Sequence, residues 1–367
     1  MALPSSGTLS LSEIATEYSV AQSNVSLATM STNISLTAPH AVSEFYGGSA
    51  GPSFTPLSYT GVAQGSAMET WRVFYNNGRW HITGQDSDGE YDISDNNASS
   101  FTNLSNSIRL NGSLAFNGDT VCAIDLSADN DDFRIFRSTN NGTSYSTVFT
   151  DTNGNYTNTR VGPHIFYHGN NRWIAFSNYT NYLSTDNGQT WTIKYGPGVG
   201  QFGGGAQSGS RIIVNDNDNF YVSDQGFGGY NVISLPYVSG SKYIPNNIAH
   251  DGNGTWLAWR YYPAGRMLKS TNNGTTWSAI STDLPAYSNG IPLKYQQGTY
   301  GDNQFHIVAC STSFTNKAGG VFSSSNDGSN FDFTELVGGN FQKGASGIHH
   351  NGTDMVAGHL FTHYKFN

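Results

Sequence analysis

The chain has 367 residues, of which 43 are glycine, 21 are tyrosine and 21 are phenylalanine, whereas only 12% are Asp, Glu, Lys or Arg. Many turn formers and aromatic residues with few charges are typical of an all-β protein with numerous short strands. The net charge of −9, without any basic run, argues against a nucleic-acid partner. No apolar run is long enough to cross a bilayer, so membrane insertion is not expected.

The first fifty residues differ from the rest of the chain. Residues 10–18 read as a short helix in which Ser10 and Glu13 have the spacing of a capping box. Residues 41–48 read as a second short helix that ends at glycine. Helices this short are not stable alone. We therefore expect residues 1–53 to form a separate segment that docks on the rest of the chain or on another protein.

The same segment carries a recognisable pattern. The residues LPSSGTLSLSEI at positions 3–14, closed by VSEFYGG at positions 42–48, resemble the N-terminal segment of many tailed-phage virion proteins. The resemblance implies that residues 1–50 bind other virion proteins and that the protein is located in the virion. The alternative is a leader that caps the base of the following domain.

Beyond a linker at residues 51–53, a hairpin pattern recurs: an apolar strand, a turn of Asn, Gly or Asp, and a second apolar strand. The seven copies lie at residues 74–80, 115–121, 166–173, 207–212, 249–256, 300–305 and 348–355. Their mean spacing is about 46 residues, which suits the four-stranded blade of a β-propeller.

A second pattern, an eight-residue turn, alternates with these hairpins. Its clearest copy is STDNGQTW at residues 184–191, and variants lie at residues 94–101, 138–145, 270–277 and 324–331, with a degenerate copy at residues 223–226. An acid or amide in each turn is expected to accept hydrogen bonds from backbone N–H groups, which is a structural role and not a catalytic one. These residues are Asn96, Asn140, Asp186, Asp224, Asn272 and Asn326.

The spacing of the eight-residue turns resembles the Asp-box repeat of sialidase-like β-propellers, over about residues 54–367. This resemblance implies a propeller, and the repeat count predicts seven blades, with six as the alternative. The last repeat ends before its fourth strand, so we expect residues 54–60 to supply that strand and to close the ring. Cys122 and Cys310 occupy equivalent strands of different repeats, which predicts two free buried thiols.

The residues give little support for a sialidase-like activity. Phe133–Phe136, FRIF, is similar to the F/Y-R-I-P motif of sialidases, but Phe136 stands in place of proline. The segment also leads straight into an eight-residue turn, so we interpret it as the third strand of a blade. No catalytic residues can be assigned, and the chain is predicted not to be an enzyme. A sialidase-like glycosidase stays an alternative.

Binding residues are expected in the variable loops, on the face opposite the turns. Tyr179, Arg260, Tyr261 and Tyr262 combine rings with polar groups, as a sugar-binding surface requires.

Four acidic loop residues suit Ca²⁺, the single cofactor considered, although solvated turns explain them too: Asp86, Asp88, Asp129 and Asp131. His349 and His350 are interpreted as an exposed pair and not as a zinc site.

Together these features predict a phage virion structural protein, a binding module of the tail-fibre or baseplate type. Its propeller would recognise a host-surface glycan or a neighbouring virion protein. A head decoration protein without a ligand is the remaining alternative.

Overall fold

The chain divides into two units, Met1–Ser53 and Phe54–Asn367. The computed structural model describes part of the second unit. The first unit, with its two predicted helices and its virion-like pattern, lies outside the described residues. The described residues are 54–56, 69–85, 90–104, 110, 113–126, 132–152, 164–177, 180–194, 203–224, 229–238, 241–260, 266–283, 287–288, 291–311, 319–325, 327–335, 347–359 and 362–366.

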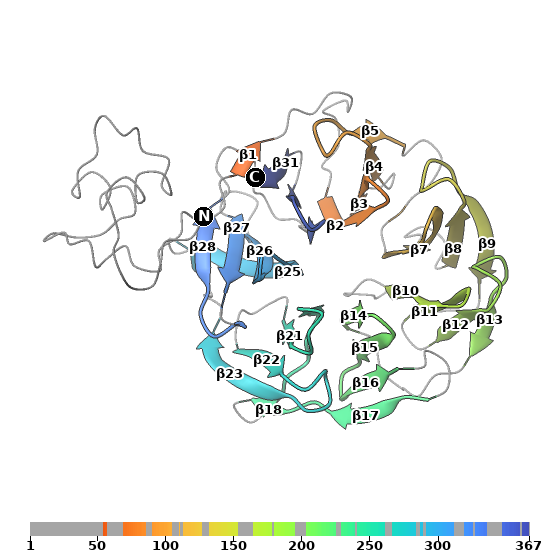
Figure 1. The fold of residues 1–367 in the computed structure, drawn as a ribbon. Coiled ribbons are helices and arrows are strands. Elements are labelled where there is room, and N and C mark those ends of the chain that lie inside the picture. The colour runs from red at the N-terminus through yellow and green to blue at the C-terminus, as the bar shows by residue number, and fades with distance from the viewer. Residues whose placement is uncertain are drawn as a thin grey trace, which may run out of the picture. The chain divides into compact units, whose positions relative to one another are not determined.

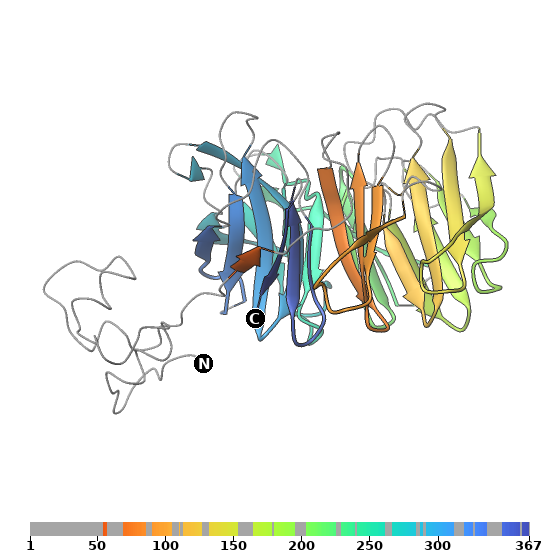
Figure 2. The ribbon, with the colours of Figure 1, turned by 90° about the horizontal axis from the view of Figure 1, so that it is seen from above.

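The second unit is an all-β propeller: antiparallel sheets stand side by side in a ring around a central opening (Figure 1). Seen from the side, the strands run between the two faces of the ring (Figure 2). Six blades have four strands each.

The strands of each blade are given from the innermost outward. The first blade consists of β2 (Glu69–Asn76), β3 (Arg79–Gln85), β4 (Glu90–Ser94) and β5 (Thr102–Asn103), and the second of β6 (Leu114–Asn117), β7 (Thr120–Leu126), β8 (Phe133–Ser138) and β9 (Ser146–Asp151). The next two are β10 (His164–Gly169), β11 (Arg172–Phe176), β12 (Asn181–Ser184) and β13 (Thr192–Lys194), then β14 (Gly205–Ser208), β15 (Arg211–Asn215), β16 (Asn219–Ser223) and β17 (Asn231–Ser234). The last two are β20 (Asn247–His250), β21 (Trp256–Trp259), β22 (Arg266–Ser270) and β23 (Ser278–Asp283), then β29 (Gly347–His350), β30 (Met355–His359), β31 (Thr362–Phe366) and β1 (Phe54–Pro56).

The remaining large sheet of the ring has five strands, which corrects the prediction of seven four-stranded blades. Its strands are β24 (Tyr287–Ser288), β25 (Ile291–Gly301), β26 (Gln304–Ser311), β27 (Gly319–Ser324) and β28 (Asp332–Glu335). The cause is the length of β25: its first residues extend beyond the regular blade and pair with β24, so that Tyr287 faces Pro292. A small hairpin of β18 (Tyr237–Val238) and β19 (Ser241–Lys242), which the sequence did not predict, lies in the connection between β17 and β20.

The closing strand expected from the sequence is β1. It pairs antiparallel with β31, and Phe54 lies opposite Phe366. The two ends of the second unit therefore share one blade, so this blade has no strand missing and the ring has no gap there.

The eight-residue turns make the expected local hydrogen bonds. In the turn at residues 184–191, one carboxylate oxygen of Asp186 accepts hydrogen bonds from the Ser184 hydroxyl at 2.7 Å and from the Thr190 N–H at 3.0 Å. The Ser184 hydroxyl oxygen accepts the Gly188 N–H at 2.9 Å. Equivalent bonds reach Asn96, Asn140 and Asn272 from the residues four places later. Asn326 lies outside the described residues.

Asp224 makes an ion pair that the sequence did not predict. It is the second residue of its degenerate turn, the place that Asp95 has in another copy, and it accepts hydrogen bonds from Arg211 at 2.6 and 2.5 Å. Asp95 likewise pairs with Arg79, at 2.5 and 2.9 Å. Asp224 therefore makes an ion pair with the adjacent hairpin turn. The turn residues 225–228, whose N–H groups it was expected to accept, lie outside the described residues.

Each turn also packs on the preceding blade. Asn187 accepts a hydrogen bond from the Asn117 side chain at 2.9 Å and donates one to Thr120 at 3.1 Å, both in the blade before its own. A Cβ added at Gly188, which has φ +79°, would lie 2.5 Å from the Cys122 sulfur atom of that blade. The glycine thus serves the contact between blades as well as the reversal of the chain.

The hydrophobic core lies between neighbouring sheets. Trp173 and Tyr182 of one blade pack with Cys122 and Ile124 of the blade before it. Comparable clusters occupy the other interfaces of the ring, and Trp80 with Val356 belongs to the one beside the closing blade. Cys122 and Cys310 are both buried and form no disulfide, as predicted.

Candidate functional site

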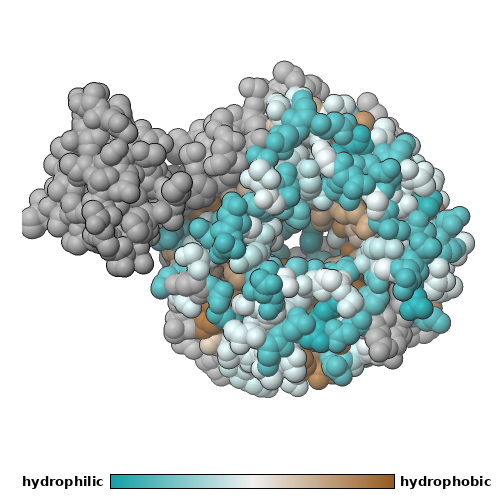
Figure 3. All heavy atoms as spheres, viewed as in Figure 1, coloured by the Kyte–Doolittle hydropathy of each residue, from teal (hydrophilic) through white to brown (hydrophobic). Residues whose placement is uncertain are grey.

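The innermost strands enclose a cavity of about 510 Å³ along the axis of the ring. The space-filling view shows an opening at the centre, bordered by both hydrophilic and apolar residues (Figure 3). The strands β2, β6, β10, β14, β20, β25 and β29 all contribute to the wall. We call this cavity the channel. No Asp or Glu is among the described residues that line it.

Strand register shows that polar residues recur at one level of the channel. In β2, Tyr75 lies opposite Trp80 beside the hairpin turn, and Arg72 is three residues before Tyr75. In β10, Tyr167 lies opposite Trp173 in the same way, which makes His164 the equivalent of Arg72. The same position, three residues before the residue beside the hairpin turn, can be found for all seven innermost strands. We call the seven residues at this position the polar ring: Arg72, Ser113, His164, Gly204, Asn247, Gln297 and Gly347.

The two glycines of the polar ring mark close backbone approaches. A Cβ on Gly347 would lie 2.8 Å from the Arg72 Cα atom, and a Cβ on Gly204 would lie 3.0 Å from the Asn247 nitrogen. At these two places the neighbouring inner strands come too close for a side chain. The other five members carry polar side chains, and all five line the channel.

Three of these five side chains join neighbouring inner strands. The Gln297 amide oxygen accepts the Val73 N–H at 3.0 Å and the Ile348 N–H at 3.2 Å, and its nitrogen donates to the Val73 carbonyl at 3.1 Å. Asn247 donates to the Tyr295 carbonyl at 3.4 Å, and His164 bonds the Gly203 carbonyl at 3.2 Å. These groups have a structural role, since they hold adjacent innermost strands together around the axis.

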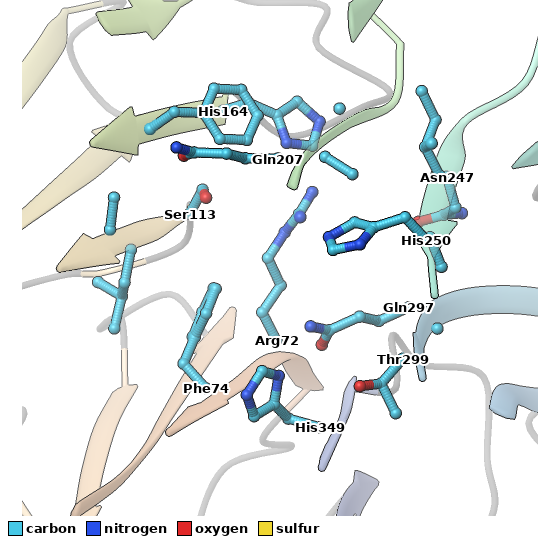
Figure 4. A pocket seen from close by; sticks show the side chains of 18 of the residues that line it. Arg72, Phe74, Ser113, His164, Gln207, Asn247, His250, Gln297, Thr299 and His349 are labelled. Carbon is cyan, nitrogen blue, oxygen red and sulfur yellow. The ribbon is translucent and has the colours of Figure 1, made fainter. Parts of the chain in front are cut away.

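Arg72 differs from the other members of the ring. It carries the permanent positive charge at this level, and its guanidinium group makes no hydrogen bond or ion pair with the described residues. Figure 4 shows the side chain extending into the channel, and the charge of Arg72 acts on His164 of the neighbouring wall. Arg72 is half-buried, and a cation that is partly withdrawn from water is usually paired. The fold alone therefore does not account for Arg72.

The electrostatics of the channel follow from burial. Burial lowers the pKa of Arg72 to about 10, so the guanidinium stays charged at neutral pH. Burial, and secondarily the charge of Arg72, lowers the pKa of His164 to about 3. Burial also lowers the pKa of His349 to about 4, with a smaller contribution from His350. Both imidazoles are neutral at pH 7, and Arg72 is the group that gives this region its positive potential.

The level of the channel beside the hairpin turns is aromatic. The rings of Tyr75 and Trp80 have centroids 4.9 Å apart, and Tyr167 with Trp173 repeats this distance. His250 on Trp256 at 4.8 Å is the same arrangement with an imidazole. Because the same pair of rings recurs in several blades, we interpret these aromatic contacts as stabilising the hairpins formed by the two innermost strands of each blade.

Of the residues predicted to bind a ligand, one, Arg260, lies in the described part of the structure. The Arg260 guanidinium lies over the Tyr243 ring, 4.7 Å from its centroid, and donates to the Ile244 carbonyl at 3.3 Å. Arg260, which follows β21, is therefore held against the segment that precedes β20. Tyr179, Tyr261 and Tyr262 lie outside the described residues, as do the proposed Ca²⁺ ligands Asp86, Asp88, Asp129 and Asp131.

Two further expectations can be compared with the structure. Phe133–Ser138 is β8, the third strand of its blade, as interpreted, and Arg134 pairs with Asp125 of β7 at 3.2 Å. His349 and His350, however, are not an exposed pair: both line the channel, and His350 is 9% exposed. Both histidines come just before a hairpin turn, and that position suggested that they are exposed. In this propeller, however, they lie in the innermost strand of a blade, which borders the channel. Within the described residues, no three His, Cys, Asp or Glu side chains cluster as metal ligands would.

Sequence reasoning missed Arg72 and the polar ring. The signal was present in the seven hairpin patterns, because aligning their turns places Arg72, His164, Asn247 and Gln297 in one column.

The described residues contain no helix with the length and apolar character of a membrane span.

No protein-family model and no curated protein sequence matches the chain. Solved propellers do resemble it in fold. A structure of YCF48 bound to a D1 peptide superposes with a TM-score of 0.59 and 13% identity, over 85% of this chain and 94% of that one. A GH74 xyloglucanase from Xanthomonas campestris gives 0.60 and 14%, over 85% and 53%. The WD40 repeats of RRP9 give 0.57 and 10%, over 86% and 98%. At these identities the likeness concerns the fold alone, and the fold class is a β-propeller.

Proposed function

We propose that the protein is a binding module of a phage virion, in which residues 1–50 attach to other virion proteins and the propeller recognises a host-surface glycan. The observation that carries the binding role is the channel: a polar ring with one charged side chain, Arg72, that the fold does not use. Pockets of about 300–1,000 Å³ with a few convergent polar groups are typical ligand sites.

Binding without hydrolysis is favoured by the chemistry of the wall. Glycoside cleavage ordinarily requires a pair of carboxylates at a set separation. No Asp or Glu is found among the described lining residues of the channel. The arginine that suggested a sialidase motif, Arg134, is engaged with Asp125.

The virion assignment is supported by the pattern of residues 1–50, and the eight-residue turns add the resemblance to Asp-box propellers. Propellers of similar fold take unrelated partners, and YCF48, one of those that resemble this chain, has been solved bound to a D1 peptide. A neighbouring virion protein is therefore the partner that the experiment must distinguish from a glycan.

The test compares the full chain with a form that lacks residues 1–50 and so keeps every described strand. We expect the full chain to co-purify with particles and the shortened chain to be lost from them. Particles without the protein should adsorb poorly to host cells, and enzymatic removal of surface glycans from the cells should reproduce that defect. Full incorporation of the shortened chain would contradict the attachment role. Normal adsorption to cells stripped of glycans would contradict glycan recognition.

A further inference from the structure

We infer that the channel holds an anion site, centred on Arg72, for a hydroxylated carboxylate of the size of an acidic monosaccharide. This inference rests on the proposed function only in taking the channel as the binding site. It adds the chemical class of the ligand and the residues that contact it.

The first step concerns the charge. The guanidinium group has five N–H donors in a planar fork that matches the two oxygens of a carboxylate. None of these donors bonds to a described residue, and Figure 4 shows the group within the channel and not along its wall. Because burial opposes the charge of Arg72, an anion that enters the channel relieves an existing cost.

The second step concerns the number of charges. Arg72 is the one Lys or Arg among the described lining residues, and the nearby His164 and His349 are neutral at pH 7. A group with a single negative charge balances Arg72. A phosphate or sulfate dianion would leave one charge unpaired in a partly buried site, which is unfavourable. A carboxylate therefore fits better than either.

The third step concerns the rest of the ligand. Ser113 lies immediately before β6, the innermost strand of the blade next to that of β2. Its hydroxyl group lines the channel and makes no hydrogen bond to a described residue, and the same holds for the hydroxyl group of Thr299. Asn247 and Gln207 use their amide nitrogens on backbone carbonyls, which leaves the amide oxygens as acceptors. These groups serve hydroxyl substituents, and the wall has hydrogen-bonding groups around its circumference (Figure 4).

Aromatic surface completes the site. Phe74 and His349 line the channel close to Arg72 in the close-up view. His349 meets Trp80 edge to face at 6.3 Å, which fixes the plane of the imidazole. Flat rings beside polar groups suit the apolar face of a sugar. A cavity of about 510 Å³ accommodates one such unit and its water.

The experiment is isothermal titration calorimetry of the full chain with three probes. Glucuronate carries the carboxylate and the hydroxyl groups, glucose has the same ring without the charge, and N-acetylglycine has a carboxylate without the hydroxyl groups. We expect glucuronate to bind at least tenfold more tightly than either of the others. Equal binding of glucose would exclude the anion site, and equal binding of N-acetylglycine would exclude the hydroxylated ligand.

Variants locate the site. Arg72→Gln is expected to weaken glucuronate binding at least tenfold, whereas Ser113→Ala weakens it about threefold, as the loss of one neutral hydrogen bond would. Arg172→Gln, which alters an exposed arginine outside the channel, is the matched control and should bind normally. Arg72→Lys keeps the charge and should retain intermediate affinity, which covers a failure of Arg72→Gln to fold. Unchanged affinity in Arg72→Gln or in Arg72→Lys would overturn the proposal.

Failure here and failure of the proposed function give different results. If the protein is a virion receptor module but Arg72 is not its site, the Arg72→Gln protein incorporates and particles adsorb normally, and glucuronate does not compete. If the anion site exists but the protein is not a receptor module, glucuronate binds the purified chain, and adsorption of particles is unaffected by removal of the protein.

Discussion

The eight-residue turns and the polar ring both place polar side chains at regular intervals around the propeller, but they use them differently. In the turns the hydrogen-bonding groups are paired within a few residues, as Asp186 is with Ser184 and Thr190. In the polar ring the partners come from other blades: Gln297 bonds to β2 and β29. Two ring members, Arg72 and Ser113, make no side-chain hydrogen bond to the described residues, and Arg72 is the charged one of the two. The difference separates what builds the fold from what is available to a ligand.

The largest effect is expected where a turn meets the neighbouring blade. Gly188→Ala should lower the free energy of unfolding by about 2–4 kcal/mol, because the residue has φ +79° and its new Cβ would lie 2.5 Å from the Cys122 sulfur. Urea unfolding monitored by tryptophan fluorescence measures the change.

Two controls separate the backbone effect from the packing effect. Gly78 has φ +81° and nothing within 4 Å of an added Cβ, so Gly78→Ala should cost only about 1 kcal/mol. Ala98 already occupies the glycine place of its turn at φ +62°, and Ala98→Gly should change stability by less than about 1 kcal/mol. Equal losses for Gly188→Ala and Gly78→Ala would mean that the turn does not pack on the preceding blade.

The second prediction concerns acid stability and the ring. The pKa of His164 is about 3 in the folded protein, mainly because of burial and next because of Arg72, against about 6.5 when unfolded. Between these values the unfolded chain binds the proton and the folded chain does not. Stability is therefore complete above pH 6.5 and falls as the pH falls toward 3, by about 2 kcal/mol between pH 6.5 and 5.

His164→Gln tests this directly, because glutamine keeps a polar side chain but does not titrate. The slope of unfolding free energy against pH should become shallower by roughly one proton in this interval. Burial, and next the charge of Arg79, lowers the pKa of His81 to about 3 as well. His81 therefore also makes the stability fall as the pH falls, and its contribution to the slope should persist in His164→Gln. An unchanged slope in His164→Gln would show that His164 binds its proton equally in the folded and unfolded states, so that folding does not lower its pKa.

The third prediction weakens a turn without touching the contact between blades. Asp186→Ala removes the acceptor for the Thr190 and Gln189 N–H groups and should cost about 1–2 kcal/mol. Asp186→Asn should be nearly neutral, since Asn140 and Asn272 perform the same role. A loss as large in Asp186→Asn as in Asp186→Ala would indicate that the charge of Asp186, and not its oxygen acceptor, stabilises the turn.

These contrasts explain what the sequence could predict. The turn at residues 184–191 was predictable because its hydrogen bonds join residues two to four places apart, and the closing strand followed from a last repeat that lacked a strand. The fifth strand of the β24–β28 sheet was not predictable, because it depends on how far β25 extends. The ion pair of Asp224 with Arg211 was not predicted either, because the two residues lie in different turns of the blade.

The candidate site was less accessible to sequence reasoning. Loop residues such as Arg260 were favoured because variable loops often bind ligands. Arg72 lies in a strand, between Trp71 and Val73, where nothing local distinguishes it from a solvated arginine. Its position on the axis depends on the register of seven hairpins and on ring closure, and its lack of a described partner depends on contacts between blades.

The smallest expected effect on stability is at Arg72 itself, and it gives the sharpest contrast with the turns. Arg72→Gln should change the free energy of unfolding by no more than about 1 kcal/mol, because it removes a half-buried charge and breaks no described hydrogen bond. The pKa of His164 should rise, since the positive charge of Arg72 contributes to lowering it, although burial keeps it below the ordinary value. Proton NMR titration of the imidazole, with Arg172→Gln as the control, measures this rise. If Arg72→Gln instead destabilised the protein as strongly as Gly188→Ala, Arg72 would belong with the groups that build the fold. In that case the contrast between turns and channel would not hold.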